Sequence, residues 1–216
     1  MGRRQLYFVW FSIFIVWAFY RSYFNLPEGI DEFLIKPLIF TAPIFYLVLI
    51  KEKKKLGELG LAPKPKDFFL DLYIGVVIGI LFALEGVIAN YIKNGQVTFA
   101  PVLALKASGG VIPFLLINLS TSFWEEILGR GYLYKRLKDI SGNQMYAALF
   151  SSFLFLLLHI PILFTRLQLR GMSLIVYPVS ILILSITNCY LFSLRKSLTL
   201  PILLHTFWNM TVALYL

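Results

Sequence analysis

Two adjacent carboxylates, Glu125 and Glu126, lie inside an otherwise apolar stretch of this 216-residue chain. A carboxylate at membrane depth is costly and is rarely kept without a partner or a chemical task. Neighbouring side chains on a helix point about 100° apart, so the two groups face different directions. Glu126 lies four residues before Arg130, which is the favoured order for an ion pair. We expect Glu126–Arg130 to be structural and Glu125 to face a polar cavity, or else to pair with another helix for packing.

Both histidines of the chain fall inside apolar stretches. Phe155 precedes His159 by four residues and Asn209 follows His205 by four, so each pair shares one helical face. At about 1.5 Å per helical residue, Glu125 and Asn209 lie about 20 Å from the basic flanks of their segments, and His159 lies about 27 Å from the start of its own. Helix tilt can absorb that spread, so these depths allow the side chains to converge.

One carboxylate, two imidazoles and one carboxamide suffice for water-mediated acyl transfer. A carboxylate withdrawn from water is a stronger base, and Glu125 can deprotonate a water that attacks a peptide carbonyl. One imidazole and the amide of Asn209 can stabilise the oxyanion, while the other imidazole orients the water or protonates the leaving amine. No Ser or Cys nucleophile is needed.

Two other chemistries use the same residues. Glu125, His159 and His205 form a two-His, one-carboxylate set that can bind a metal such as zinc, which then activates the water. Asn209 fits an oxyanion donor better than a metal ligand, which favours a reaction without a cofactor. A buried Glu and His set is also found in proton relays of transporters.

The composition places these residues in a membrane. Hydrophobic residues make up 59% of the chain and the mean hydropathy is +0.78, whereas soluble domains rarely exceed half apolar. We expect an integral multi-pass protein, in the cell membrane, in contact with membrane lipid. The net charge of +9 is explained by basic loops, so we expect no nucleic-acid partner. The single cysteine, Cys189, excludes an internal disulfide.

The hydropathy pattern predicts an all-α bundle of about seven transmembrane helices in one domain, 1–216, with its motif-bearing core at 111–216. The expected spans are 6–20, 34–50, 68–92, 111–136, 145–164, 172–192 and 198–216. Of the 20 Lys and Arg residues, 14 lie at the N-terminus, after the second span, within the last part of the fourth span or just after it, or after the sixth span. This bias predicts an N-in, C-out topology. Gly75 and Gly79 in the third span predict close helix packing.

Several other polar residues lie within or beside these spans. We place Lys36 at the outer end of the second span. Asn118, Asn188 and Ser185 fit interhelical hydrogen bonds. Glu85 has the options of pairing with Arg130 or joining the site.

Three motifs resemble those of a known family. E-E-x-x-x-R at 125–130, F-x-x-x-H at 155–159 and H-x-x-x-N at 205–209 occur in the order found in the CPBP intramembrane proteases. That family includes CAAX prenyl proteases of the Ras-converting type and bacteriocin-processing or self-immunity proteins. The motifs cover about 85 residues on separate predicted helices.

The resemblance implies an intramembrane endopeptidase that cleaves a hydrophobic, lipidated or bacteriocin-like peptide. Glu125 would activate the water, His159 would assist, and His205 with Asn209 would form the oxyanion hole. Glu126, Arg130 and Phe155 would support the site. The family has often been labelled metal-dependent, although its prenyl proteases resemble metal-free glutamate proteases. A non-proteolytic immunity protein and, further off, a proton-coupled transporter are the alternatives.

Overall fold

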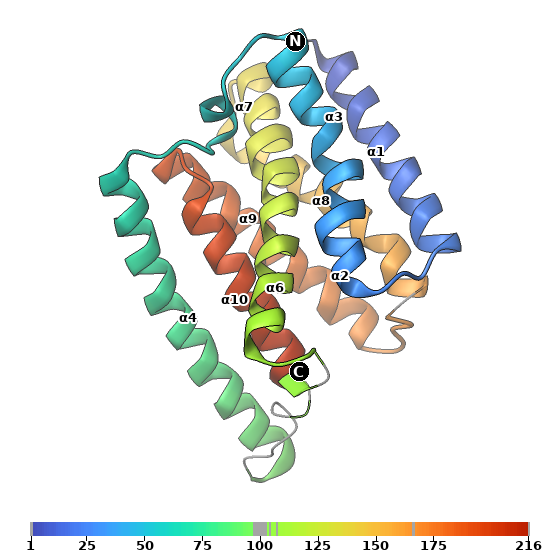
Figure 1. Ribbon diagram of the computed structural model, residues 1–216, viewed down its shortest axis with the longest axis vertical. Coiled ribbons are helices and arrows are strands. Elements are labelled where there is room, and N and C mark those ends of the chain that lie inside the picture. Colours follow the sequence, from blue (N-terminus) through green and yellow to red (C-terminus); the bar gives the residue numbers. More distant parts are fainter. Residues whose placement is uncertain (1, 97–102, 104, 107, 166, 216) are drawn as a thin grey trace.

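The computed structural model describes residues 2–215 except 97–102, 104, 107 and 166. The described residues form helices and their connections, with no strand among them. The helices pack as a bundle, with the start of α1 and the end of α10 at opposite ends (Figure 1). This arrangement confirms the predicted all-helical polytopic bundle and agrees with an odd number of spans.

Within the described residues, six helical spans are long and apolar enough to cross a membrane. They are α1 (Arg3–Tyr23), Glu28–Lys51, α4 (Pro65–Asn94, apolar to Ile92), Val111–Ser141, α8 (Gln144–Thr165) and α9 (Ser173–Arg195). The seventh predicted span corresponds to α10 (Thr199–Tyr215), which has 17 residues. A short 3₁₀ helix, η4 (Leu56–Leu59), lies between the second span and α4.

Two spans change their helical winding along their length. The second joins α2 (Glu28–Ile30), η1 (Asp31–Ile35), η2 (Pro37–Thr41), α3 (Ala42–Phe45) and η3 (Tyr46–Lys51), where η1, η2 and η3 are π-helical. The fourth joins α6 (Val111–Glu126), π-helical η5 (Ile127–Tyr134) and α7 (Lys135–Ser141). π-Helical turns are rare and are often found at functional sites. Their presence directs attention to the region where these two spans meet.

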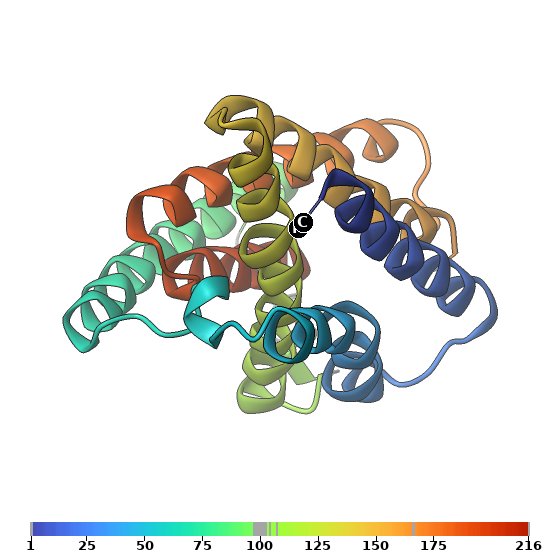
Figure 2. The same ribbon diagram turned by 90° about the horizontal axis from the view of Figure 1, so that it is seen from above.

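Close packing joins α4 to α10. A Cβ added to Gly75 would lie 2.5 Å from Cδ1 of Leu203, and one added to Gly79 would lie 2.8 Å from the ring of Phe207. The small residues therefore let α10 approach the backbone of α4, as the Gly-x-x-x-Gly spacing predicts. Seen from above, the span containing α6 runs through the middle of the bundle, between α4 on one side and α1 on the other (Figure 2).

The outer surface of the bundle is apolar. Large hydrophobic side chains are strongly exposed on α1, α4 and α9, for example Phe8, Ile92 and Leu194. Such residues can lie in lipid without the cost of exposing apolar surface to water. The polar groups of the site, by contrast, gather inside the bundle around α6.

Candidate active site

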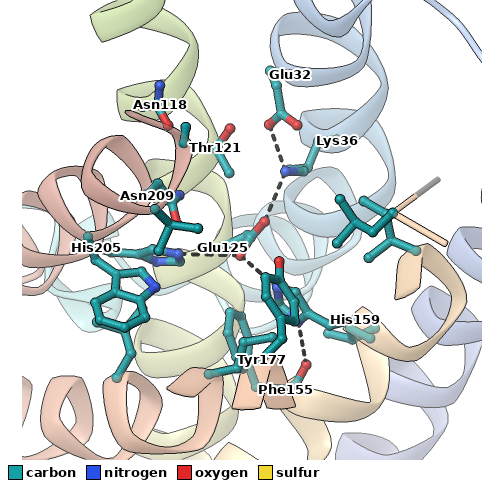
Figure 3. Close-up of a pocket in the computed structure, with 18 of the residues that line it drawn as sticks. Glu32, Lys36, Asn118, Thr121, Glu125, Phe155, His159, Tyr177, His205 and Asn209 are labelled. Atoms are coloured by element: carbon teal, nitrogen blue, oxygen red, sulfur yellow. Dashed lines mark hydrogen bonds and ion pairs between the residues drawn. The ribbon is translucent and has the colours of Figure 1, made fainter. Parts of the chain in front are cut away.

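Three helices bring the predicted site residues together around Glu125. Nε2 of His159, from α8, lies 3.4 Å from Oε2 of Glu125, and Nε2 of His205, from α10, lies 3.8 Å from the same oxygen (Figure 3). The carboxylate belongs to α6 and is 5% exposed. Oε2 accepts no hydrogen bond from the described residues. The three side chains therefore converge, as their depths allow, and one oxygen of Glu125 faces both imidazoles.

Glu126 points the other way and ties several elements together. Its Oε1 lies 3.0 Å from a guanidinium nitrogen of Arg130 and accepts a hydrogen bond from Nδ2 of Asn188 at 2.9 Å. It also lies 2.8 Å from Nδ1 of His205. Glu126 and Arg130 are both fully buried. The pairing expected from the four-residue spacing is confirmed, and Asn188 makes the interhelical bond that its position predicted.

Phe155 supports both the ion pair and the histidines. The guanidinium of Arg130 lies 4.6 Å from the centre of its ring, within the range of a cation–π contact. The ring centre of His159 lies 4.8 Å from that of Phe155, and the ring centre of His205 lies 6.3 Å from it. Phe155 thus packs against both imidazoles and the guanidinium of Arg130.

The hydrogen bonds at Nδ1 define how each imidazole faces Glu125. Nδ1 of His159 lies 3.0 Å from the carbonyl oxygen of Phe155, which can only accept, so this nitrogen carries the hydrogen. Nδ1 of His205 faces the carboxylate of Glu126 and donates to it in the same way. Both Nε2 atoms therefore face Glu125, as a lone pair in a neutral ring or as an N–H in a protonated one.

The fourth group at Glu125 was not expected. Nζ of Lys36 donates a hydrogen bond to Oε1 of Glu125 at 2.9 Å and lies 2.7 Å from Oε2 of Glu32. Lys36 is buried, whereas the hydropathy pattern places it at the outer end of the second span. Only the four-residue spacing between Glu32 and Lys36 within an apolar segment signalled an ion pair here. Glu125 therefore both faces a cavity and pairs with another helix.

These groups line a cavity of about 420 Å³ inside the bundle. Asn209, one turn after His205 on α10, faces it, as do Asn118 and Thr121 of α6 and Tyr177 of α9 (Figure 3). The rest of its wall is largely apolar and includes Trp17, Phe40, Leu158, Ile162, Ile181 and Val212. A mainly apolar cavity with a few convergent polar groups is typical of a small-molecule or peptide site.

Two other polar residues behave differently from our expectations. Glu85 is exposed on α4, while Arg130 pairs with Glu126, so the structure does not bear out an ion pair between Glu85 and Arg130. Asn118 donates to the carbonyl of Phe114 within α6 at 2.8 Å and so does not make the interhelical bond we expected. A polar side chain four residues after a carbonyl can be satisfied by its own helix.

The zinc alternative fits this arrangement poorly. The described residues contain no group of three or more His, Cys, Asp or Glu side chains placed to hold a metal ion. The ammonium of Lys36 already contacts one oxygen of Glu125. A divalent ion on the other oxygen would lie close to that positive charge, and like charges repel strongly where water is excluded.

The fold and the site together define a multi-pass membrane protein with a buried carboxylate–imidazole centre. Residues 107–211 match the sequence model of the family described as type II CAAX prenyl endopeptidase Rce1-like. The match covers nearly half of the chain, includes all three motifs, and supports the CPBP/CAAX intramembrane protease family that the motifs predicted. No curated protein and no solved structure matched the chain.

Proposed function

We propose that the protein is an intramembrane endopeptidase that hydrolyses a peptide bond of a hydrophobic or lipidated membrane peptide. Glu125 is the base, and no metal takes part. The observation that carries the proposal is the position of Oε2 of Glu125, which faces Nε2 of both His159 and His205 at the wall of a cavity inside the bundle.

Water activation follows from this geometry. Oε2 of Glu125 and Nε2 of His159 are 3.4 Å apart, close enough for one water to contact both. That water donates one hydrogen to each and directs a lone pair at the scissile carbonyl carbon. Glu125 takes the proton as the new C–O bond forms, then passes it to the amine as the C–N bond breaks.

The charge balance of the site assigns a role to His205. Glu32, Glu125 and Glu126 carry three negative charges, and Lys36 and Arg130 carry two positive ones. One further proton makes this buried group neutral, and burial strongly favours neutrality. We place that proton on His205, because its two ring nitrogens face the carboxylates of Glu126 and Glu125.

A protonated His205 donates through Nε2 to the oxyanion of the tetrahedral intermediate. Asn209, one turn later on the same helix and at the same cavity, supplies a second donor through its side-chain amide. Two donors aimed at the developing charge are the usual composition of an oxyanion hole. The carboxylate of Glu126 balances the positive charge of this imidazolium.

The substrate class follows from the setting of the cavity and from the family. The cavity lies between membrane helices and its wall is mainly apolar, which suits a hydrophobic or lipidated peptide. The family description names CAAX prenyl endopeptidases, which supports a prenylated C-terminal peptide as the first substrate to examine. We place this reaction in the cell membrane.

The test is cleavage of quenched peptides by detergent-purified protein. The panel contains prenylated CAAX peptides, the same peptides without the lipid, and unrelated hydrophobic peptides. Glu125→Gln is expected to abolish cleavage while the protein stays folded, and a strong chelator is expected to leave the wild-type rate unchanged. Glu85→Gln is the matched control, because Glu85 is exposed on α4 and away from the cavity.

Four other results would contradict this mechanism, and each would favour a different assignment. Full activity of Glu125→Gln overturns the assignment of the base. Loss of activity with chelator and recovery with zinc moves Glu125, His159 and His205 to metal ligands. If no peptide is cleaved and a bacteriocin-protection phenotype survives Glu125→Ala and His159→Ala, the non-proteolytic immunity function replaces this one. Proton-coupled solute uptake in proteoliposomes would instead identify a transporter.

A further inference from the structure

Three buried charges of alternating sign run from the second span to the site: Glu32, Lys36 and Glu125. We propose that Lys36, held by Glu32, is the positioning residue of Glu125: it binds Oε1, keeps the carboxylate ionised, and leaves Oε2 to face the two imidazoles. This inference rests on the proposed function of Glu125 as a base. It adds a site residue from the part of the chain that precedes the family match at 107–211.

The ammonium of Lys36 contacts two carboxylates, and through them it can hold Glu125 in place. It is 3% exposed, and its ammonium lies 2.7 Å from Glu32 and 2.9 Å from Glu125. A buried ammonium that lost both partners would be strongly destabilising, so burial holds Lys36 in this position. Glu32 is itself buried, and the second carboxylate that Lys36 contacts is Glu125.

The backbone around Lys36 fixes its distance from α6. Lys36 lies between η1 and η2, and its N–H bonds the carbonyl of Asp31, five residues earlier. The carbonyl of Glu32 accepts hydrogen bonds from Oγ of Ser120 at 2.9 Å and Nε1 of Trp124 at 3.0 Å, both on the helix that carries Glu125. These two hydrogen bonds attach the segment that carries Glu32 and Lys36 directly to α6, the helix that carries Glu125.

Lys36 is the fixed positive charge beside Glu125. The other titratable groups that face the carboxylate are His159 from α8, Tyr177 from α9 and His205 from α10. Arg130 is directed at Glu126 instead. Without Lys36, an apolar cavity would favour the neutral acid, and a neutral Glu125 cannot accept a proton from water.

The consequence can be measured without any substrate. Hydrophobic carbodiimides modify carboxyl groups in apolar sites when these are protonated, and mass spectrometry of peptides locates the adduct. We expect wild-type Glu125 to resist dicyclohexylcarbodiimide near neutral pH, and Lys36→Met to raise its labelling rate about 10-fold or more, since a neighbouring opposite charge favours the ionised form that strongly. Lys36→Arg is expected to restore the resistance.

Two controls define this experiment. The double variant Lys36→Met/Glu125→Gln must lose the adduct at position 125. Arg21→Met removes another buried cation, which pairs with Asp31 and lines the same cavity, and it is expected to leave the labelling of Glu125 at the wild-type rate. Equal labelling of Glu125 in wild type and Lys36→Met, or none in either, overturns the proposal, as does an equal effect of Arg21→Met.

A second readout joins the inference to catalysis. In Lys36→Met the acid limb of the kcat profile is expected to move to higher pH, with a lower kcat and a KM near the wild-type value, and Lys36→Arg is expected to return the profile towards the wild type. A loss of activity with an unshifted profile contradicts the positioning role. If the wild type cleaves no peptide while the labelling responds to Lys36 as described, the proposed protease function fails and the Lys36 assignment stands.

Discussion

Nζ of Lys36 lies 2.9 Å from Oε1 of Glu125, although the two residues are 89 positions apart in the sequence. The contact joins the second span to the helix that carries the E-E-x-x-x-R motif. Its partner Glu32 and the hydrogen bonds from Ser120 and Trp124 make this junction a network and not a single pair. The candidate centre is therefore built from both halves of the chain, although its three motifs lie in one.

The role of Asn209 predicts a selective loss of turnover. Asn209→Ala removes one oxyanion donor and is expected to lower kcat by about 10² to 10³ with little change in KM. Steady-state cleavage kinetics measure both. Asn118→Ala is the matched control, because Asn118 faces the same cavity but its amide already donates to the carbonyl of Phe114. An equal fall in kcat for both variants would count against the oxyanion role.

The ion pair inside the bundle predicts a large effect on stability. Arg130→Leu removes the guanidinium from the buried carboxylate of Glu126, and breaking a buried ion pair typically costs about 3–5 kcal/mol of unfolding free energy. Thermal unfolding in detergent reports the change. Lys135→Met breaks the exposed pair with Glu58 and is expected to cost less than about 1 kcal/mol. Similar melting temperatures for the two variants would contradict a structural role of Glu126–Arg130.

The contact between α4 and α10 predicts sensitivity to one methyl group. Gly75→Ala places a Cβ 2.5 Å from Leu203 and is expected to destabilise the protein by about 1–3 kcal/mol. Activity is expected to fall as well, because α10 carries His205 and Asn209. Adding Leu203→Ala should relieve the clash and recover part of both losses. Gly29→Ala is the control, since an added Cβ there meets nothing within 4 Å; a comparable loss in that variant would rule out the clash as the cause.

The loop before α4 predicts a small dependence of stability on pH. The Lys135 ammonium, 2.9 Å from Glu58, lowers the pKa of the Glu58 carboxyl below its ordinary value. A lowered pKa in the folded state stabilises the protein above the ordinary pKa, and this contribution is lost as pH falls through the lowered value. Glu58 is about half exposed, so the contribution stays below about 1 kcal/mol.

This contribution is measured by comparison with Glu58→Gln. The difference in melting temperature between wild type and variant is expected to be present at neutral pH, to shrink in acid and to weaken in high salt, because exposed charges are screened. A difference that grows as the pH falls would reverse the sign and contradict the pairing.

Local patterns in the sequence account for much of this architecture. Long apolar segments separated by basic loops predicted the helical spans, because a spanning segment needs about 20 apolar residues in a row. The four-residue spacing of Glu126 and Arg130 also predicted their ion pair, because residues four apart share one helical face. The resemblance of the three motifs to those of the CPBP proteases implied that Glu125, His159 and His205 share one site, and the depth of these residues allowed it.

What the tertiary structure alone decided is the environment of Glu125. Hydropathy placed Lys36 at the outer end of its span, whereas π-helical winding and the packing of that span against α6 turn its ammonium to Glu125. Tertiary packing also left Glu85 exposed on α4 and turned one oxygen of Glu125 to the imidazoles and the other to Lys36. The sequence by itself determined that Glu125, His159, His205 and Asn209 lie in apolar helical segments, since this depends on the hydropathy of each segment alone. Their partners depend on how separate helices pack, which no local pattern encodes.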